Sequence, residues 1–319
     1  MEILPGLYRL ESYIGDKLVA HHLVTGDRSV LIDAGTPALA EQEVIPWLTA
    51  ILGSPARLDT IVITHADVDH FGGLATLHAA CPRAAIVAPV RDRRWIENPD
   101  LIFAERYDAY HADHGLTYAP EVTAMLHDWH GPPVPIDVGV CGGEYLRCGE
   151  STTLQVLHVP GHTPGHLMLW HAEKRVALIA DALNGATQID RHGTWTAPPP
   201  YMDRDLYLTS VQTVRSLDPA ILLTGHYPVM RGNDVTTFLD ASRDFVLRTD
   251  QVLDRLLREA TEPLTLVQCI ERANPLLGPF GFPPDLAFAL VAHLEWLERQ
   301  HRIRRLRRDG VVAWERTFS

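Results

Sequence analysis

Lysine is nearly absent from this chain of 319 residues, since Lys17 and Lys174 are its two lysines and arginine supplies the remaining side-chain positive charge. Acidic residues outnumber basic ones, and the formal net charge is −12. A protein that coats nucleic acid needs a broad field of positive charge, so this balance argues against such a general role. It leaves room for a local basic patch.

Paired cysteines and long apolar runs are missing as well. The cysteines are Cys81, Cys141, Cys148 and Cys269, and no Cys-x-x-Cys pair suggests a zinc ribbon or a disulfide framework. No run approaches the ~18–20 apolar residues that a membrane-spanning helix needs. The opening residues MEILPGLYRLESY do not read as a signal peptide. We therefore expect a globular cytoplasmic protein without a membrane partner.

Strand-like and helix-like segments alternate along most of the chain, which predicts an α/β fold. Residues 91–145 break this rhythm, being aromatic and rich in proline, and we interpret them as an insertion that caps the site or forms a homodimer interface. A break at residues 261–263 (TEP) predicts a domain boundary. Residues 1–260 would then form the catalytic domain. Residues 261–319, with two helices and a hairpin turning at Asp309-Gly310, would form a winged-helix-like domain.

Histidine and aspartate follow several of the expected buried strands. The relevant stretches are THADVDHFGG (64–73), HVPGHTPGH (158–166), LIADAL (178–183) and LLTGH (222–226). Loops at the carboxyl ends of strands meet at one edge of such a fold. Imidazole and carboxylate groups that converge there are what a dinuclear metal site needs. The sequence therefore predicts a metal centre.

The order of LIDAG, THxxxDHxGG, PGHTPGH, AD and GH resembles the metallo-β-lactamase-fold metallo-hydrolases, particularly the glyoxalase II and lactonase side of that superfamily. The resemblance covers roughly residues 5–235. It implies an αββα sandwich, in which two central sheets are flanked by helices and the metals lie at one edge.

The resemblance also implies a role for each matching residue. One metal would be bound by His65, Asp67 and His162, the other by Asp69, His70 and His226, and Asp181 would bridge both. Asp33 and His166 would support the ligands without binding metal, His166 as a hydrogen-bonded structural residue. A hydroxide that bridges two divalent metals, zinc in the first place, would attack the substrate, with Asp181 and Asp69 as catalytic residues.

Asp67 departs from the common family pattern HxHxDH, because this chain reads HADVDH. Aspartate could be a ligand, or it could be too short to reach and leave one site weak. We interpret Asp67 as a ligand, because a buried unpaired carboxylate beside metals would be costly. A carboxylate-rich site also makes iron or manganese plausible.

These features predict a hydrolase of a small ester-like molecule such as a lactone or thioester. The alternative is a phosphodiesterase or endoribonuclease whose C-terminal domain binds RNA through its basic run of Arg299, Arg302, Arg304, Arg305, Arg307 and Arg308. The preceding helix offers Glu295 and Glu298, which is poor phosphate chemistry, so packing on the catalytic domain is favoured. Tyr201 and Tyr227 are candidate hydrogen-bond donors to substrate. His111 and His114 imitate the metal motif, but we expect them, with His127 and His130, to be surface residues.

Overall fold

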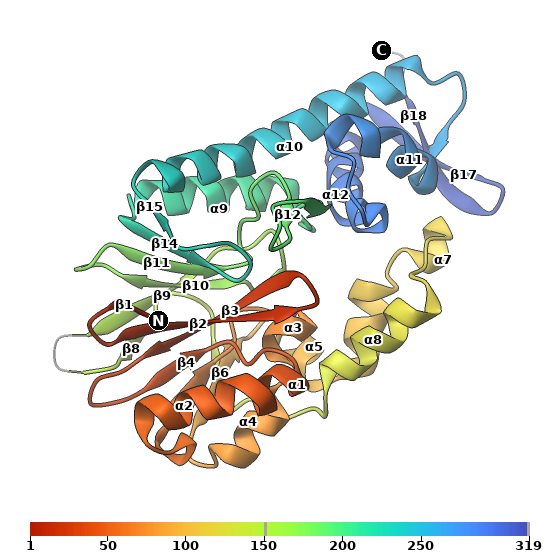
Figure 1. The fold of residues 1–319 in the computed structure, drawn as a ribbon. Coiled ribbons are helices and arrows are strands. Elements are labelled where there is room, and N and C mark those ends of the chain that lie inside the picture. The colour runs from red at the N-terminus through yellow and green to blue at the C-terminus, as the bar shows by residue number, and fades with distance from the viewer. Residues whose placement is uncertain (150–151, 318–319) are drawn as a thin grey trace.

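Two mixed β-sheets lie face to face in the computed structural model, which describes residues 1–149 and 152–317 (Figure 1). The first sheet has the order β1-β2-β3-β4-β5-β6-β7, with β1 (Glu2–Leu4), β2 (Leu7–Ile14), β3 (Lys17–Val24), β4 (Val30–Ile32), β5 (Thr60–Val62), β6 (Ala85–Pro89) and β7 (Val138–Val140). The second has the order β15-β14-β11-β10-β9-β8, with β8 (Tyr145–Arg147), β9 (Thr153–His158), β10 (Leu167–His171), β11 (Val176–Ala180), β14 (Ile221–Thr224) and β15 (Met230–Arg231).

Parallel pairing within each sheet sets where the functional loops emerge. Strands β4 to β7 are parallel to one another, as are β11 and β14. Since the carboxyl ends of parallel neighbours lie at the same edge of a sheet, the loops after β5, β11 and β14 can meet there.

Helices cover the outer face of each sheet. The first sheet is covered by α1 (Pro37–Leu39), the π-helical turn η1 (Ala40–Val44), α2 (Ile45–Leu52), the 3-10 turn η2 (Pro55–Arg57), α3 (Val68–Phe71) and α4 (Leu74–Ala80). The second is covered by α9 (Arg204–Ser216) and α10 (Asn233–Glu259). One apolar core lies between the sheets, and one lies under each helical layer. The predicted αββα sandwich is confirmed.

The insertion is shorter than the predicted 91–145. Its helical part comprises α5 (Arg93–Glu97), α6 (Pro99–Ile102), the π-helical turn η3 (Phe103–Tyr107), α7 (His111–His114) and α8 (Pro120–His130). The chain then returns to the sandwich, because β7 pairs with β6 and β8 pairs with β9. Residues 138–147 are therefore mostly strands of the two sheets, a feature that their glycines and short apolar runs concealed.

The C-terminal segment contains the helices and the hairpin that the sequence predicts. Its elements are β16 (Leu264–Thr265), α11 (Leu266–Leu277), the 3-10 turn η4 (Pro283–Asp285), α12 (Leu286–Arg299), β17 (Ile303–Arg308) and β18 (Val311–Arg316). Thr265 and Gln268 form a capping box that fixes the start of α11. Buried side chains of this segment, such as Trp314, belong to the same apolar cluster as those of α9, α10 and the second sheet. The segment therefore shares its core with them.

A small hairpin, β12 (Gln188–Ile189) and β13 (Trp195–Ala197), stands between the second sheet and the C-terminal segment (Figure 1). Among the described residues, none of the helices combines the length and apolar character required to cross a lipid bilayer.

Candidate metal centre and substrate cavity

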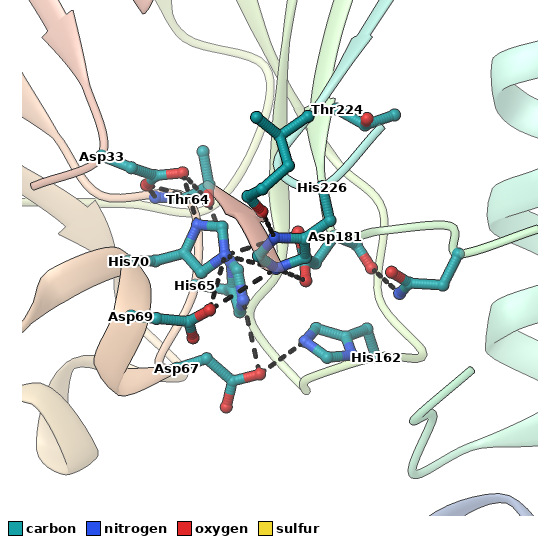
Figure 2. A network of polar contacts seen from close by, with 12 residues as sticks. Asp33, Thr64, His65, Asp67, Asp69, His70, His162, Asp181, Thr224 and His226 are labelled. Carbon is teal, nitrogen blue, oxygen red and sulfur yellow. Dashed lines mark hydrogen bonds and ion pairs between the residues drawn. The ribbon is translucent and has the colours of Figure 1, made fainter. Parts of the chain in front are cut away.

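Every predicted metal ligand lies in a segment that follows a strand, at one edge of the two sheets. The loop after β5 carries His65 and Asp67, and the short helix α3 that follows it carries Asp69 and His70. The loops after β9, β11 and β14 carry His162, Asp181 and His226, respectively. Figure 2 shows these side chains pointing toward one another across the edge. All are buried except Asp67, which is partly exposed.

The Nδ1 atom of each of the four histidines is held by a group outside the cluster. His70 donates to Asp33 Oδ2 at 2.9 Å, and His226 donates to the carbonyl of Leu18 at 2.6 Å. His65 Nδ1 lies 2.9 Å from Thr64 Oγ1, and His162 Nδ1 contacts the carbonyl of Pro200. A partner on Nδ1 fixes the ring and leaves Nε2 as the atom that can bind a metal.

Two buried atoms inside the cluster have no hydrogen-bond partner among the described residues, His65 Nε2 and Asp181 Oδ1. Such atoms are costly unless something binds them. In each of three groups of residues, the candidate ligand atoms lie within 4.8 Å of one another. The groups are His65/Asp67/His162, His65/His70/Asp181 and Asp69/His70/His226. Imidazole nitrogens and carboxylate oxygens suit divalent metals, so the residues present fit such ions.

The charges around the cluster also favour a cation. Burial lowers the pKa of His65 to about 4, so this ring is neutral and can act as a ligand. Although burial opposes charge on His70, the carboxylates of Asp181 and Asp33 outweigh it and raise the pKa of His70 to about 10. The cluster thus draws positive charge to its centre.

Comparisons with known proteins agree with this geometry. Residues 19–226 match the family described as the metallo-beta-lactamase superfamily. The chain belongs to this superfamily.

Individual relatives of this superfamily member are distant in sequence. Over 241 residues it is 26% identical to a beta-lactamase-like protein 2 homolog of Caenorhabditis elegans. This match covers 75% of this chain and 65% of the nematode protein, just under two thirds of its length. It is 27% identical over 218 residues to an acyl-coenzyme A thioesterase of Gallus gallus, covering 64% of this chain and 71% of that protein. A crystal structure of a metallo-beta-lactamase family protein from Thermus thermophilus matches with a TM-score of 0.76 and 25% identity, covering 99% of this chain and 100% of that one.

Asp33 lies where a residue that orients the metallo-beta-lactamase loop would have to lie. Its Oδ1 accepts from the Thr64 backbone N–H at 2.8 Å, and its Oδ2 accepts from His70 at 2.9 Å. The backbone of Asp33 has a positive φ of 63°, a conformation that aspartate tolerates better than most residues. Asp33 therefore connects the end of β4 to Thr64, after β5, and to His70 of α3.

His166 differs from the expectation of a hydrogen-bonded residue. Its ring is buried and stacks on His65, with centroids 4.4 Å apart, and neither ring nitrogen has a partner among the described residues. Its support of His65 is therefore packing rather than hydrogen bonding. A polar support comes instead from Asp92, which accepts from Thr163 Oγ1 at 2.5 Å and from the Gly165 N–H at 2.7 Å. Nothing in RDRRW, the sequence around Asp92, marked it.

Tyr201 and Tyr227 lie in the apolar core, which corrects their expected role as donors to substrate. The Tyr201 side chain is fully buried, and its hydroxyl lies 2.8 Å from His293 Nε2 on α12. The Tyr227 hydroxyl donates to the carbonyl oxygens of Asn184 and Thr187. Both hydroxyls are thus occupied by protein groups, and neither residue lines the cavity described next.

A cavity of about 550 Å³ opens beside the candidate metal ligands Asp67, Asp69 and Asp181. The insertion contributes Tyr118, Met125 and Trp129 to its wall, among others. The C-terminal segment contributes Phe282, Asp285 and Phe288. The two segments join over the cavity, because the Tyr118 hydroxyl donates to Asp285 at 2.8 Å. Burial raises the pKa of Asp285 to about 6.

The sequence did not indicate the contacts that three cavity residues make. Arg106 and Tyr107 of η3 both contact Asp67, and Lys17 lies 2.9 Å from Asp69 Oδ2. Nothing in the local sequence distinguishes these residues from others of their type. Their partners are far along the chain, with a separation of 39 positions for Arg106 and Asp67.

Of the four histidines of the insertion that were expected at the surface, only two are exposed. His111 and His127 are exposed, as expected. His114 is buried instead, stacking on Trp314 with centroids 5.3 Å apart, and His130 is buried against Phe71. None of them belongs to the metal-ligand sets found among the described residues.

The basic run of the C-terminal segment is largely neutralised within the chain. Arg299 is exposed at the end of α12. The others form ion pairs, namely Arg302 with Asp254, Arg304 with Glu315, Arg305 with Glu298, Arg307 with Asp113 and Arg308 with Glu262. The helix that would enter a nucleic-acid groove, α12, is buried over most of its residues. These contacts count against RNA binding through this segment.

Proposed function

We propose that this protein is a metal-dependent hydrolase that cleaves a thioester, or a related ester such as a lactone, with an apolar acyl portion. The observation that carries the proposal is the composition of the cavity. Metal-ligand side chains lie at one end, and aromatic and aliphatic side chains of the insertion and of the C-terminal segment form the walls. An apolar wall with a few convergent polar groups suits an apolar organic ligand. A matched relative named as an acyl-coenzyme A thioesterase supports the same chemistry.

Two divalent metals, zinc in the first place, would be held by the predicted ligands. These are His65, Asp67 and His162 for one metal and Asp69, His70 and His226 for the other, with Asp181 shared. When bound, such metals would activate a water molecule and polarise the carbonyl of the substrate.

The side chains around the ligands would then handle the protons. The Asp69 carboxylate lines the cavity in its ionised form, 2.9 Å from the Lys17 ammonium and 3.5 Å from His226 Nε2, and it would accept the proton of the attacking water. Lys17 lies at the cavity wall and can supply a proton to the leaving group. In the overall step the water oxygen bonds to the carbonyl carbon, the carbon–sulfur bond breaks, and the proton passes to the thiolate.

We also propose that residues 261–319 serve the catalytic domain as a wall of its cavity. Phe282 and Phe288 face the cavity from this segment, and the Tyr118–Asp285 hydrogen bond ties it to the insertion. Closing an apolar wall over the acyl group excludes bulk water from the reaction.

The proposal is tested by comparing three substrates on metal-loaded enzyme, namely an octanoyl thioester, a lactone with an octyl side chain and an activated phosphodiester. Chelator-treated enzyme is the blank. We expect metal-dependent turnover of the thioester or the lactone, and little turnover of the phosphodiester. Turnover of the phosphodiester alone would overturn the proposal and favour the nuclease alternative.

A further inference from the structure

Asp67 occupies the position before α3 where an aspartate often caps a helix, yet it does not do so. Its backbone is extended, with φ −114° and ψ 137°, but its carboxylate accepts no hydrogen bond from the backbone of that helix. The helix start therefore does not explain why an aspartate stands here. The explanation must lie in the groups that its two carboxylate oxygens contact.

The two oxygens of Asp67 face in different directions. Oδ1 is occupied by the insertion, because it accepts from Arg106 Nε at 2.6 Å and from the Tyr107 hydroxyl at 3.2 Å. Oδ2 lies 2.7 Å from Arg106 Nη2, 2.8 Å from His162 Nε2 and 3.6 Å from His65 Nε2. Only Oδ2 of Asp67 thus lies next to other candidate metal ligands, and this oxygen also accepts a hydrogen bond from the Arg106 guanidinium.

Arg106 cannot easily release this carboxylate. Its side chain is 2% exposed, Nη1 contacts the Met202 sulfur at 3.1 Å, and its guanidinium carbon lies 5.1 Å from the centre of the Phe288 ring. A guanidinium that left Asp67 would remain buried among these groups with its charge uncompensated, which is expensive. The ion pair is therefore a fixed part of the structure.

Asp69, the corresponding carboxylate of the second ligand set, has a different partner. It pairs with Lys17, whose side chain is 34% exposed and ends in a flexible ammonium group. Lys17 can turn toward solvent when a cation approaches Asp69, at small cost. The first carboxylate is thus permanently shared with a positive charge, whereas the second can be freed.

We propose that Arg106, supplied by the insertion, holds Asp67 as a one-oxygen ligand and thereby makes His65/Asp67/His162 the weaker of two metal positions. A fixed guanidinium lowers the donor strength of the carboxylate and repels an arriving cation. The inference rests on the metal dependence proposed above. It gives the departure from HxHxDH a physical consequence, which is that the two positions fill in sequence rather than together.

Metal binding can be measured without any substrate. Apo-protein is titrated with Zn²⁺ against a chromogenic chelator, and the wild type should show one tight and one weak position. In Arg106→Gln the weak position should tighten by about tenfold while the tight one is unchanged. Removing a group that supports a metal ligand changes affinity by a similar factor but weakens binding, so the direction of the change identifies the role of Arg106. Arg94→Gln is the matched control, because Arg94 belongs to the same insertion but makes an exposed ion pair with Glu105.

A second variant guards against misfolding of Arg106→Gln. In the double variant Asp67→His/Arg106→Leu the buried ion pair is replaced by an imidazole and an apolar side chain, an exchange that buried pairs often tolerate. It should bind two Zn²⁺ with similar affinities. Equal affinities in the wild type, or a weak position that does not tighten in either variant, would overturn the inference. Failure of the wild type to bind Zn²⁺ at all would instead refute the proposed metal dependence.

Discussion

The ligand-bearing loops and the segments that wall the cavity are held in place by different forces. The ligand rings are fixed by buried groups of the sandwich, such as Asp33 and the Leu18 carbonyl. The walls meet through the partly buried Tyr118–Asp285 hydrogen bond, the stacking of His114 on Trp314 and the exposed Arg307–Asp113 ion pair. Buried hydrogen bonds fix geometry, whereas exposed ion pairs contribute little. On the proposed function, the sandwich would set the chemistry and the walls would set the substrate.

The largest expected effect is on the sandwich side of this comparison. Asp181→Asn should lower kcat for the thioester by about 10³-fold or more, because an amide cannot replace a shared carboxylate at the centre of the site. Asp181 Oδ2 lies 2.9 Å from His226 Nε2, and Asn could retain one such contact, so the melting temperature should change little. Steady-state kinetics and circular dichroism check both parts. Substantial residual turnover would contradict the assignment.

The candidate metal ligands could be predicted from the sequence because each lies within a short motif next to a buried apolar strand. His65 to His70 follow β5 directly, and His226 follows β14. Both a strand and its loop can be read locally, so neither requires knowledge of the tertiary structure. The αββα order of elements was predictable for the same reason.

The walls could not be read in this way, because their contacts join distant segments. Tyr118 and Asp285 are 167 positions apart, and Thr163 and Asp92 are 71 apart. For Tyr201 and Tyr227 the prediction was wrong for a different reason. Proximity in sequence to the site suggested a role, but their side chains turn into the core, where His293 and the Asn184 carbonyl take their hydroxyls. Which face a loop residue presents depends on packing that the sequence does not show.

The second prediction asks whether the C-terminal wall folds with the sandwich. Leu290 of α12 is fully buried in the core shared with α9 and α10. Leu290→Ala should therefore lower the free energy of unfolding of the whole chain by about 3 kcal/mol. Urea unfolding followed by far-ultraviolet circular dichroism and by tryptophan fluorescence should give one coincident transition. Two separate transitions would show that residues 261–319 form an independent domain, as the sequence break at 261–263 suggested.

The third prediction concerns the contact between the two walls. The pKa of Asp285, raised by burial to about 6, exceeds the ordinary value near 4, so the folded protein holds this proton more tightly than the unfolded chain. Stability from this group is therefore complete at low pH and is lost as pH rises from about 4 to 6. Asp285→Asn should remove that loss and raise stability at pH 7 by about 1–2 kcal/mol, less than the full shift implies, because Asp285 is partly exposed at the cavity wall.

Urea unfolding of both proteins from pH 4 to 8 measures the difference. Groups other than Asp285 titrate equally in the two proteins, so the difference between the curves isolates this carboxyl. A constant difference across the range would rule out the raised pKa, whereas a difference that grows between pH 4 and 6 is expected. Asn can still accept from the Tyr118 hydroxyl, so the contact between the walls should survive.

The smallest effect should fall on the substrate rather than on the fold. Met125 lies on α8 at the cavity wall and is 36% exposed, so Met125→Ala should leave stability nearly unchanged. Apolar contact is worth roughly 0.8 kcal/mol per buried methylene, so kcat/KM for an octanoyl thioester should fall about fourfold or more. The acetyl thioester lacks the alkyl chain that would contact Met125 and should be hydrolysed at the wild-type rate. Leu247→Ala, an exposed apolar site on α10, is the matched control. An equal loss of kcat/KM on both thioesters would mean that Met125 contributes to catalysis itself. It would contradict the distinction between a sandwich that carries the chemistry and walls that select the substrate.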